Sequence, residues 1–347
     1  MQGGFRGEQG ILRISGFDDY FYLQWHITNS CNLRCSHCYI EEDKPPLGRE
    51  ALISVVEKYD EFLKRMGLRG RIQFTGGEPL ICGDLFILLD EARKKNMPTR
   101  ILSNGTLLTR DTAIMLKDSG CKIVQISLDG DRQTHNAIRG EFAYEKAIEG
   151  ARILKKEGIS VTIMMTLSTV NHTLLKPVYD EVLAGAAVDR FSFSRLVPIG
   201  RGASYRGDTL SKTQLKGLFK VGRQLKSDHR MEMPMRDPLW GPYLNSRSLS
   251  KGNPRLLSGC SIGYNGICVD SDGSVYPCRR LPLRLGNIMT DDFGKLWNDE
   301  ILNHLRNRDV LKGKCRKCRY RWQCGGCRAV AYAIHGDYME EDPQCFI

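Results

Sequence analysis

From about residue 20 to residue 196, short runs of β-branched and aromatic residues alternate with longer stretches in which apolar residues recur every three to four positions. This pattern is typical of repeated strand–helix units around a parallel sheet. The six predicted strands cover residues 22–28, 71–75, 100–103, 122–128, 160–167 and 190–195. The five predicted helices cover residues 48–66, 84–95, 110–119, 144–156 and 173–186. Six units are fewer than the eight that close a full barrel, so we predict an α/β fold, a partial (βα)6 TIM-like barrel with its chemistry at the C-terminal strand ends.

The chain divides into four parts by composition. Residues 1–20 form an N-terminal extension, residues 21–197 the predicted barrel, residues 198–257 a basic linker and residues 258–347 a cysteine-rich module. The linker is rich in Gly, Pro and Ser and contains one predicted helix, at residues 211–227. The last part is too short and too rich in Gly and Arg to build a large core, so we expect a small α+β domain that bound metal stabilises.

The composition is that of an ordinary globular protein, with 41% hydrophobic and 26% charged residues in a chain of 347. No apolar run approaches the roughly 18 to 20 residues that cross a bilayer, and the first ten residues lack the apolar core of a secretion signal. We therefore expect no membrane partner and a cytoplasmic location. In that reducing compartment, 13 cysteines indicate metal binding or thiol chemistry rather than disulfides.

The net charge of +11 predicts an acidic partner. Between residues 195 and 255 there are 13 Lys and Arg residues against four acidic ones. This basic run forms either a solvated surface or a lip that receives an anionic substrate. Nucleic acid is not favoured as the partner, because no motif interleaves aromatic and basic residues.

The first cysteine cluster directly follows the first predicted strand and reads Cys31-Asn-Leu-Arg-Cys35-Ser-His-Cys38. Three thiolates at this spacing can hold a 4Fe-4S cluster whose fourth iron has no protein ligand, and such an iron can bind and reduce another molecule. Structural zinc is the alternative, with His37 or His26 as the fourth ligand. A single three-cysteine loop after a strand is nevertheless a poor match to a zinc ribbon.

This loop, followed by the aromatic Tyr39, resembles the cluster signature of radical S-adenosylmethionine (SAM) enzymes. The segment Thr75-Gly76-Gly77-Glu78-Pro79, at the end of the second predicted strand, is similar to the Gly-Gly-Glu-Pro motif of that family. The resemblance implies that this segment receives the methionine amino group of SAM. Glycines let backbone carbonyls approach a ligand closely, and the Glu78 carboxylate would neutralise the ammonium.

The next two strand ends extend the resemblance. Ser103-Asn104-Gly105 and Ser127-Leu128-Asp129-Gly130 resemble the family's contacts to the ribose and carboxylate of the cofactor. Arg139, in His135-Asn-Ala-Ile-Arg, resembles the arginine that reaches the methionine carboxylate. The implied SAM-binding residues are Tyr39, Gly76, Gly77, Glu78, Pro79, Ser103, Asn104, Ser127, Asp129 and Arg139. The implied mechanism is one-electron reduction of SAM by the cluster, followed by hydrogen abstraction from the substrate by a 5′-deoxyadenosyl radical.

The C-terminal cysteines resemble the SPASM extension of these enzymes, which binds two auxiliary 4Fe-4S clusters and would bring the total to three. The resemblance implies a distal cluster whose ligands are Cys315, Cys318, Cys324 and Cys345. It also implies a cluster nearer the barrel, the proximal cluster, whose ligands are Cys260, Cys278 and Cys327. Two Cys-x2-Cys pairs also suit a zinc ribbon, but a ribbon would not need the other cysteines.

Three further cysteines lie outside these ligand sets. Cys268 precedes the turn at residues 272–273 and is either a possible fourth ligand of the proximal cluster or a buried packing residue. Cys82, beside the predicted cofactor loop, and Cys121, at the start of a strand, fit core positions. They are secondary candidates for a catalytic hydrogen donor.

The preferred substrate hypothesis is a peptide or protein of acidic character, because enzymes with this extension most often modify genetically encoded peptides. Arg279 and Arg280 follow Cys278 where the sulfatase-maturing branch has an aspartate, so formylglycine formation is not expected. About 20 residues precede the first strand, so recognition of a leader peptide would need a separate protein, a direct groove or a leaderless substrate. An external electron donor such as flavodoxin or ferredoxin is also expected.

Two alternatives remain. The tail from Cys327 to Cys345 resembles that of enzymes in the alternative haem and haem d1 routes, which modify tetrapyrrole side chains. Such substrates carry several carboxylates, which a basic lip would suit. The third hypothesis is a non-catalytic iron–sulfur or zinc protein that binds nucleic acid through its positive charge.

Overall fold

The computed structural model describes residues 20–41, 44–185, 188–244 and 259–347. The predicted extension at residues 1–20, apart from its last residue, and the end of the predicted linker lie outside the described residues. In the described part, no helix is long and apolar enough to cross a membrane.

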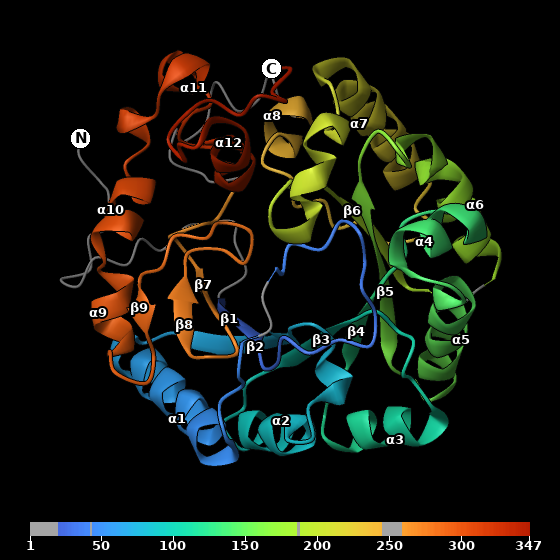
Figure 1. Ribbon diagram of the computed structural model, residues 1–347, viewed down its shortest axis with the longest axis vertical. Coiled ribbons are helices and arrows are strands. Elements are labelled where there is room, and N and C mark those ends of the chain that lie inside the picture. The colour runs from blue at the N-terminus through green and yellow to red at the C-terminus, as the bar shows by residue number, and fades with distance from the viewer. Residues whose placement is uncertain (1–19, 42–43, 186–187, 245–258) are drawn as a thin grey trace.

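Six parallel strands with helices along their outer face form the first part of the molecule (Figure 1). Consecutive strands pair with each other in sequence order. The strands are β1 (Tyr20–His26), β2 (Arg69–Thr75), β3 (Thr99–Ser103), β4 (Ile123–Ser127), β5 (Ser160–Leu167) and β6 (Arg190–Arg195). The helices that join them include α1 (Arg49–Met66), α2 (Leu85–Lys94), α3 (Arg110–Asp118), α5 (Ala143–Lys156) and α6 (Leu175–Ala184). The partial barrel is thereby confirmed, and each predicted element lies within two residues of its observed bounds.

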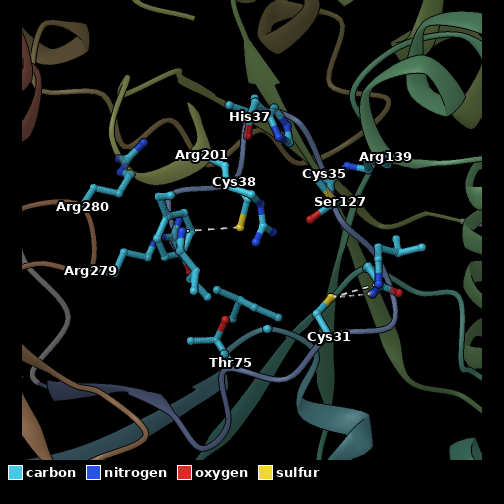
Figure 2. A pocket seen from close by; sticks show the side chains of 18 of the residues that line it. Cys31, Cys35, His37, Cys38, Thr75, Ser127, Arg139, Arg201, Arg279 and Arg280 are labelled. Atoms are coloured by element: carbon cyan, nitrogen blue, oxygen red, sulfur yellow. Dashed lines mark hydrogen bonds between the residues drawn. The ribbon is translucent and has the colours of Figure 1, made fainter. Parts of the chain in front are cut away.

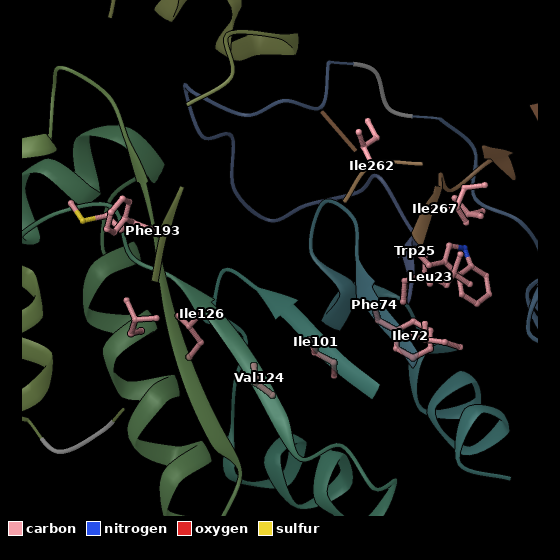
Figure 3. Packing of buried hydrophobic residues seen from close by; sticks show 14 of the residues in the cluster. Leu23, Trp25, Ile72, Phe74, Ile101, Val124, Ile126, Phe193, Ile262 and Ile267 are labelled. Carbon is pink, nitrogen blue, oxygen red and sulfur yellow. The ribbon is translucent and has the colours of Figure 1, made fainter. Parts of the chain in front are cut away.

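Alternation along the strands separates the packing core from the interior of the barrel. Leu23, Trp25, Ile72 and Phe74 are fully buried, and the strand register places Leu23 beside Ile72 and Trp25 beside Phe74 (Figure 3). The intervening positions point to the opposite face. On β4 to β6 several of these are polar, and they line the cavity described below, namely Gln125, Ser127, Thr166 and Ser194.

The cysteine-rich part extends the same sheet. Strand β7 (Gly266–Val269) pairs in parallel with β1, and β8 (Ser274–Tyr276) and β9 (Gly286–Asn287) continue it in antiparallel fashion. A Cβ atom at Gly266 would lie 2.4 Å from the ring of Tyr22, so glycine permits this close approach. The helices that follow are α9 (Phe293–Trp297), α10 (Glu300–Arg306), α11 (Gly313–Lys317) and α12 (Arg328–His335). The predicted α+β character is confirmed, but a sheet shared with the barrel was not anticipated.

Several short elements were absent from the prediction. Helix α4 (Arg132–Arg139) lies between β4 and α5, and α8 (Trp240–Leu244) follows α7 (Lys212–Ser227), which is the predicted linker helix. The 3-10 helices are Pro79–Ile81, His172–Leu174, Gly200–Asp208 and Arg308–Val310. Ser211 accepts a hydrogen bond from the backbone of Gln214 and so caps α7, which explains why that helix begins one residue later than predicted.

Candidate functional site

A cavity of about 350 Å³ lies at the C-terminal ends of the barrel strands. It is lined by the three cysteines of the first loop, which Figure 2 shows on one continuous segment. Most of the residues predicted to bind SAM also line it, namely Tyr39, Gly76, Gly77, Ser103, Asn104, Ser127 and Arg139. Residues from four strand ends and from α4 are thus brought together in one place.

The cysteine loop supplies sulfur atoms that face hydrogen-bond donors. The backbone N–H of Leu33 donates to Cys31 Sγ and that of Ile40 donates to Cys38 Sγ, each at 3.4 Å. Arg139 Nη1 lies 3.8 Å from Cys35 Sγ. Burial raises the pKa values of Cys31 and Cys35. Amide and guanidinium donors stabilise sulfur-bound negative charge, so this donor set suits an iron–sulfur cluster.

The two histidines considered as zinc ligands have other partners. His37 Nε2 lies 2.8 Å from Asp129 Oδ2. His26 lies between the hydroxyl of Tyr39, at 3.4 Å, and the carboxylate of Asp270, at 3.5 Å. Within the described residues, no group of three or more Cys, His, Asp or Glu side chains is arranged around a single metal-ion position. The fit of the loop to an iron–sulfur cluster therefore rests on its donor set.

Gly76 and Gly77 connect the end of β2 to the backbone just before the cysteine loop. A Cβ atom at Gly76 would lie 2.0 Å from the carbonyl oxygen of Thr28, and one at Gly77 would lie 2.2 Å from that of Ser30. Gly76 also has a φ of +146°, which favours glycine. The two glycines thus fix how closely the cofactor loop and the cysteine loop approach each other.

Replacing Gly77 with alanine is expected to push these loops apart. Overpacking of this kind costs about 1–3 kcal/mol. We expect SAM affinity to fall about tenfold or more, measured by equilibrium binding to reconstituted protein. The matched control is Gly83→Ala, because a Cβ atom there would meet no atom within 4 Å. Equal affinities in the two variants would contradict this account of Gly77.

Glu78 and Pro79 are not among the residues that line the cavity, and their implied role toward SAM stays a prediction. Glu78 is fully buried. Its carboxylate accepts hydrogen bonds from Ser103 Oγ at 2.9 Å, from the backbone N–H of Asn104 at 2.7 Å and from that of Leu80 at 3.2 Å. Burial raises the pKa of Glu78 to about 7, although these donors oppose the rise. In this structure Glu78 joins the ends of β2 and β3, and the adjacent glycines face the cavity instead.

Asp129 is also fully buried and does not line the cavity. Its carboxylate lies 2.6 Å from Arg139 Nε, 2.8 Å from His37 Nε2 and 2.7 Å from the backbone nitrogen of Thr166. Burial raises its pKa, but Arg139 and His37 outweigh that effect and hold the pKa well below its usual range. Asp129 therefore orients Arg139, which does reach the cavity, and links α4 to the cysteine loop.

The imidazole of His135 completes this arrangement. It accepts a hydrogen bond at Nδ1 from the backbone N–H of Asp129, at 3.0 Å. Burial and the charge of Arg139 lower its pKa to about 4, so the ring is neutral and can act as an acceptor. The sequence motif at residues 135–139 thus supplies two hydrogen-bond partners of Asp129, namely His135 and Arg139.

The C-terminal cysteines fall into two electrostatically coupled groups. Burial raises the pKa of Cys260 to about 11, and charges on Cys327 and Cys278 raise it further. In the second group, charges on Cys315 and Cys318 raise the pKa of Cys345, and a charge on Cys345 raises that of Cys324. These charge effects act within the two ligand sets that the resemblance implied, and the assignment of those sets to two auxiliary clusters stays a prediction.

Hydrogen bonds to sulfur recur in the distal group. Backbone N–H groups of Tyr320 and Gly326 donate to Cys318 Sγ at 3.4 Å and to Cys324 Sγ at 3.3 Å. The donor set therefore suits a second iron–sulfur site as well. Cys268 is buried on β7, where burial and a charge on Cys278 raise its pKa. It lies near the proximal group, and its role as a fourth ligand stays a prediction.

The structure does not bring Cys82 or Cys121 to the cavity. Cys121 is buried in the core and its thiol lies 3.6 Å from the carbonyl oxygen of Ile123. Cys82 follows the 3-10 helix Pro79–Ile81 and is half-buried. Because neither thiol lines the cavity, neither is placed to donate hydrogen to a molecule bound there.

Three arginines form a wall of the cavity that sequence reasoning did not assign to it. Figure 2 shows Arg279 and Arg280 on one side, Arg139 and Ser127 on the other, and the cysteine loop between them. Arg201 lines the cavity from the 3-10 helix Gly200–Asp208. We call Arg201, Arg279 and Arg280 the arginine wall.

The arginine wall has no acidic partner among the described residues. The guanidinium of Arg279 lies 5.6 Å from the ring centre of Tyr39, and Arg280 Nη1 donates to the carbonyl oxygen of Arg195 at 3.1 Å. The buried Nε atoms of Arg201 and Arg280 have no hydrogen-bond partner. In contrast, Lys216 and Lys220 of the basic linker are exposed on α7. Most of the basic linker residues on α7 therefore form a solvated surface. The basic lip of the cavity consists mainly of residues after Cys278.

Comparison with known proteins places these features in context. Residues 25–192 match the model of the radical SAM superfamily, and residues 260–319 match that of SPASM, an iron–sulfur cluster-binding domain. The AdoMet-dependent heme synthase of Methanosarcina barkeri is 30% identical, over 93% of this chain and 95% of that protein. The antilisterial bacteriocin subtilosin biosynthesis protein AlbA of Bacillus subtilis is 26% identical, over 94% of this chain and 72% of that protein.

Among solved structures, SuiB of Streptococcus suis bound to S-adenosylmethionine superposes with a TM-score of 0.76 at 17% identity. The match covers 98% of this chain and 79% of that one. At this identity the similarity establishes the fold, including the way in which the C-terminal part follows the barrel.

Proposed function

Because the chain belongs to the radical SAM superfamily and carries a SPASM domain, and is thus an enzyme that uses SAM and iron–sulfur clusters, we propose that its substrate is a tetrapyrrole with carboxylate side chains. The observation that carries this proposal is the arginine wall, whose guanidinium groups face the cavity without carboxylate partners among the described residues. Arginine binds carboxylates through paired, charge-assisted hydrogen bonds. The relative named as a heme synthase supports the same substrate class.

The chain's own residues divide the cavity between cofactor and substrate. Cys31, Cys35 and Cys38 would hold the cluster, and Arg139, oriented by Asp129, would bind the carboxylate of SAM. When bound there, SAM would supply the radical chemistry that abstracts hydrogen from the substrate. Arg279 and Arg280, on the side opposite Arg139, and Arg201, beside Cys38, would bind carboxylates of the substrate and so direct one side chain toward the cysteine loop.

Replacing Arg279 with glutamine is expected to weaken binding of a porphyrin tetracarboxylate. A hydrogen bond to a charged group contributes about 1.5–3 kcal/mol, so the Kd should rise by about tenfold or more. Fluorescence titration of the reconstituted enzyme measures it. Lys216→Gln is the matched control, because it also removes one positive charge, but from the exposed face of α7.

A matched ligand separates charge recognition from apolar contact. The tetramethyl ester of the same porphyrin keeps the ring and loses the carboxylates, so we expect it to bind weakly to the wild-type enzyme and no worse to Arg279→Gln. Equal affinity of the wild-type enzyme for acid and ester would contradict the proposed role of the arginine wall.

A peptide or protein substrate is the second candidate, supported by the relative from Bacillus subtilis that is named for bacteriocin biosynthesis. An acidic peptide would also find partners in the arginine wall. If the enzyme consumes SAM in the presence of an acidic peptide from a neighbouring gene, and binds no porphyrin, the peptide hypothesis replaces the tetrapyrrole one.

A further inference from the structure

Two arginines of the C-terminal part are completely buried without an acidic partner in the described residues. Arg308 is 0% exposed and Arg328 is 1% exposed. The Nε atom of each has no hydrogen-bond partner. Arg195 is equally buried, but it forms ion pairs with Asp237 and Asp342. Arginine stays charged in proteins, and a buried charge without a counter-charge is strongly unfavourable. No carboxylate of the described residues therefore neutralises Arg308 or Arg328.

Arg308 connects the two groups of C-terminal cysteines. It donates from Nη1 to the carbonyl oxygen of Cys324 at 3.1 Å, and from Nη2 to that of Cys260 at 2.8 Å. Cys324 belongs to the distal group and Cys260 to the proximal group. The guanidinium group therefore lies against both cysteine groups.

The space for this guanidinium is provided by a glycine. A Cβ atom at Gly325 would lie 1.0 Å from Arg308 Nη1, and Gly325 has a φ of +65°. Tyr264 covers the guanidinium, with its ring centre at 5.4 Å. The chain thus accommodates a buried cation between the two cysteine groups by means of a residue without a side chain.

Arg328 contacts the distal group alone. It donates from Nη1 to the carbonyl oxygens of Tyr338 and Glu340, at 2.8 and 2.6 Å. Its Nη2 lies 3.9 Å from Cys315 Sγ. Arg328 therefore contacts one cysteine group and Arg308 contacts two, although the two arginines are similar in charge and burial.

We propose that Arg308 is the shared counter-cation of the two auxiliary clusters and that Arg328 serves the distal cluster alone. This inference rests on the ligand assignment given above. A 4Fe-4S cluster with thiolate ligands is anionic and gains another negative charge on reduction. A buried cation beside it stabilises the reduced form and raises the reduction potential, and the effect is strong because the surroundings are poorly solvated. A cation between two clusters raises both reduction potentials together, so both clusters are easier to reduce.

The test is a potentiometric titration, followed by electron paramagnetic resonance, of the full chain with alanine at Cys31, Cys35 and Cys38. About eight auxiliary irons would remain in that protein. We expect Arg308→Gln to shift both auxiliary potentials to more negative values and Arg328→Gln to shift only one. Arg308→Lys, which keeps the charge, should stay close to the parent protein. Arg316→Gln is the matched control, because Arg316 is exposed on α11 beside Cys315, and it should shift neither potential.

The iron content of each variant shows whether its auxiliary clusters have assembled. Loss of auxiliary iron in Arg308→Gln, with full iron in Arg308→Lys, supports the proposal, because charge alone separates the two. Full iron with unchanged potentials in Arg308→Gln overturns it, as does an equal effect of the lysine and glutamine variants. A parent protein without auxiliary iron overturns the ligand assignment as well, so the two failures are distinguishable.

Discussion

Replacing Cys38 with alanine is expected to abolish the formation of 5′-deoxyadenosine from SAM. Cys38 lines the cavity, and its sulfur accepts a hydrogen bond from the backbone N–H of Ile40. With only three cysteines in the loop, loss of one leaves two ligands, which is too few to hold the cluster in place. Because the cluster supplies the electron that SAM cleavage requires, the rate should fall to that of the reaction without enzyme.

The measurement is chromatography of anaerobic reactions with dithionite, together with iron analysis. We expect Cys38→Ala to lose about four of about 12 irons and to keep the auxiliary clusters. Cys82→Ala is the matched control, because it also removes a thiol. That thiol lies after β2 and does not line the cavity. This variant should keep both the iron and the activity. Product formation by Cys38→Ala, or an equal loss in Cys82→Ala, would refute the assignment of the first cluster.

The barrel was predictable because residues close together in the sequence mark each strand and each helix. Each strand is a short β-branched or aromatic run between helical stretches, and the chemistry-bearing residues follow the strand ends directly. Cys31 and Gly76 are therefore found from their position after a strand. The short helix α4 was missed because its eight residues are too few to show a helical period. Its N-cap, Asp131, accepts a hydrogen bond from the backbone N–H of Thr134 and is a signal that could have identified it.

The sequence could not show which polar groups form hydrogen bonds with each other. Glu78 and Asp129 follow strands as expected. Their carboxylates, however, accept hydrogen bonds from Ser103 and Thr166, which lie 25 and 37 positions away in the sequence. These contacts depend on the register of neighbouring strands. In the same way, Arg201 and Arg279 meet at one cavity from segments far apart in the chain, so a motif-based prediction misses the arginine wall.

The largest loss of stability is expected for Arg195→Met. Arg195, at the end of β6, is 3% exposed and pairs with two buried carboxylates. The nearest nitrogens and oxygens are 2.5 Å apart for Asp237 and 2.9 Å apart for Asp342. Asp342 also accepts a hydrogen bond from the backbone N–H of Cys327. Methionine fills similar space but leaves both carboxylates buried without a cation. Removing one partner of a buried ion pair costs about 3–5 kcal/mol.

Arg190→Met is the matched control on the same strand. Arg190 pairs with Glu232 at 2.6 Å, but the Glu232 side chain is 62% exposed. Water stabilises the carboxylate that is left behind, so the loss should be less than about 1 kcal/mol. Urea titrations under anaerobic conditions measure both variants, because Trp25, Trp240 and Trp297 are buried and report unfolding by fluorescence. If both variants lower the urea midpoint equally, burial of the Arg195 network does not determine its contribution. If only Arg195→Met does so, that network holds the barrel, the linker and the cysteine-rich tail together.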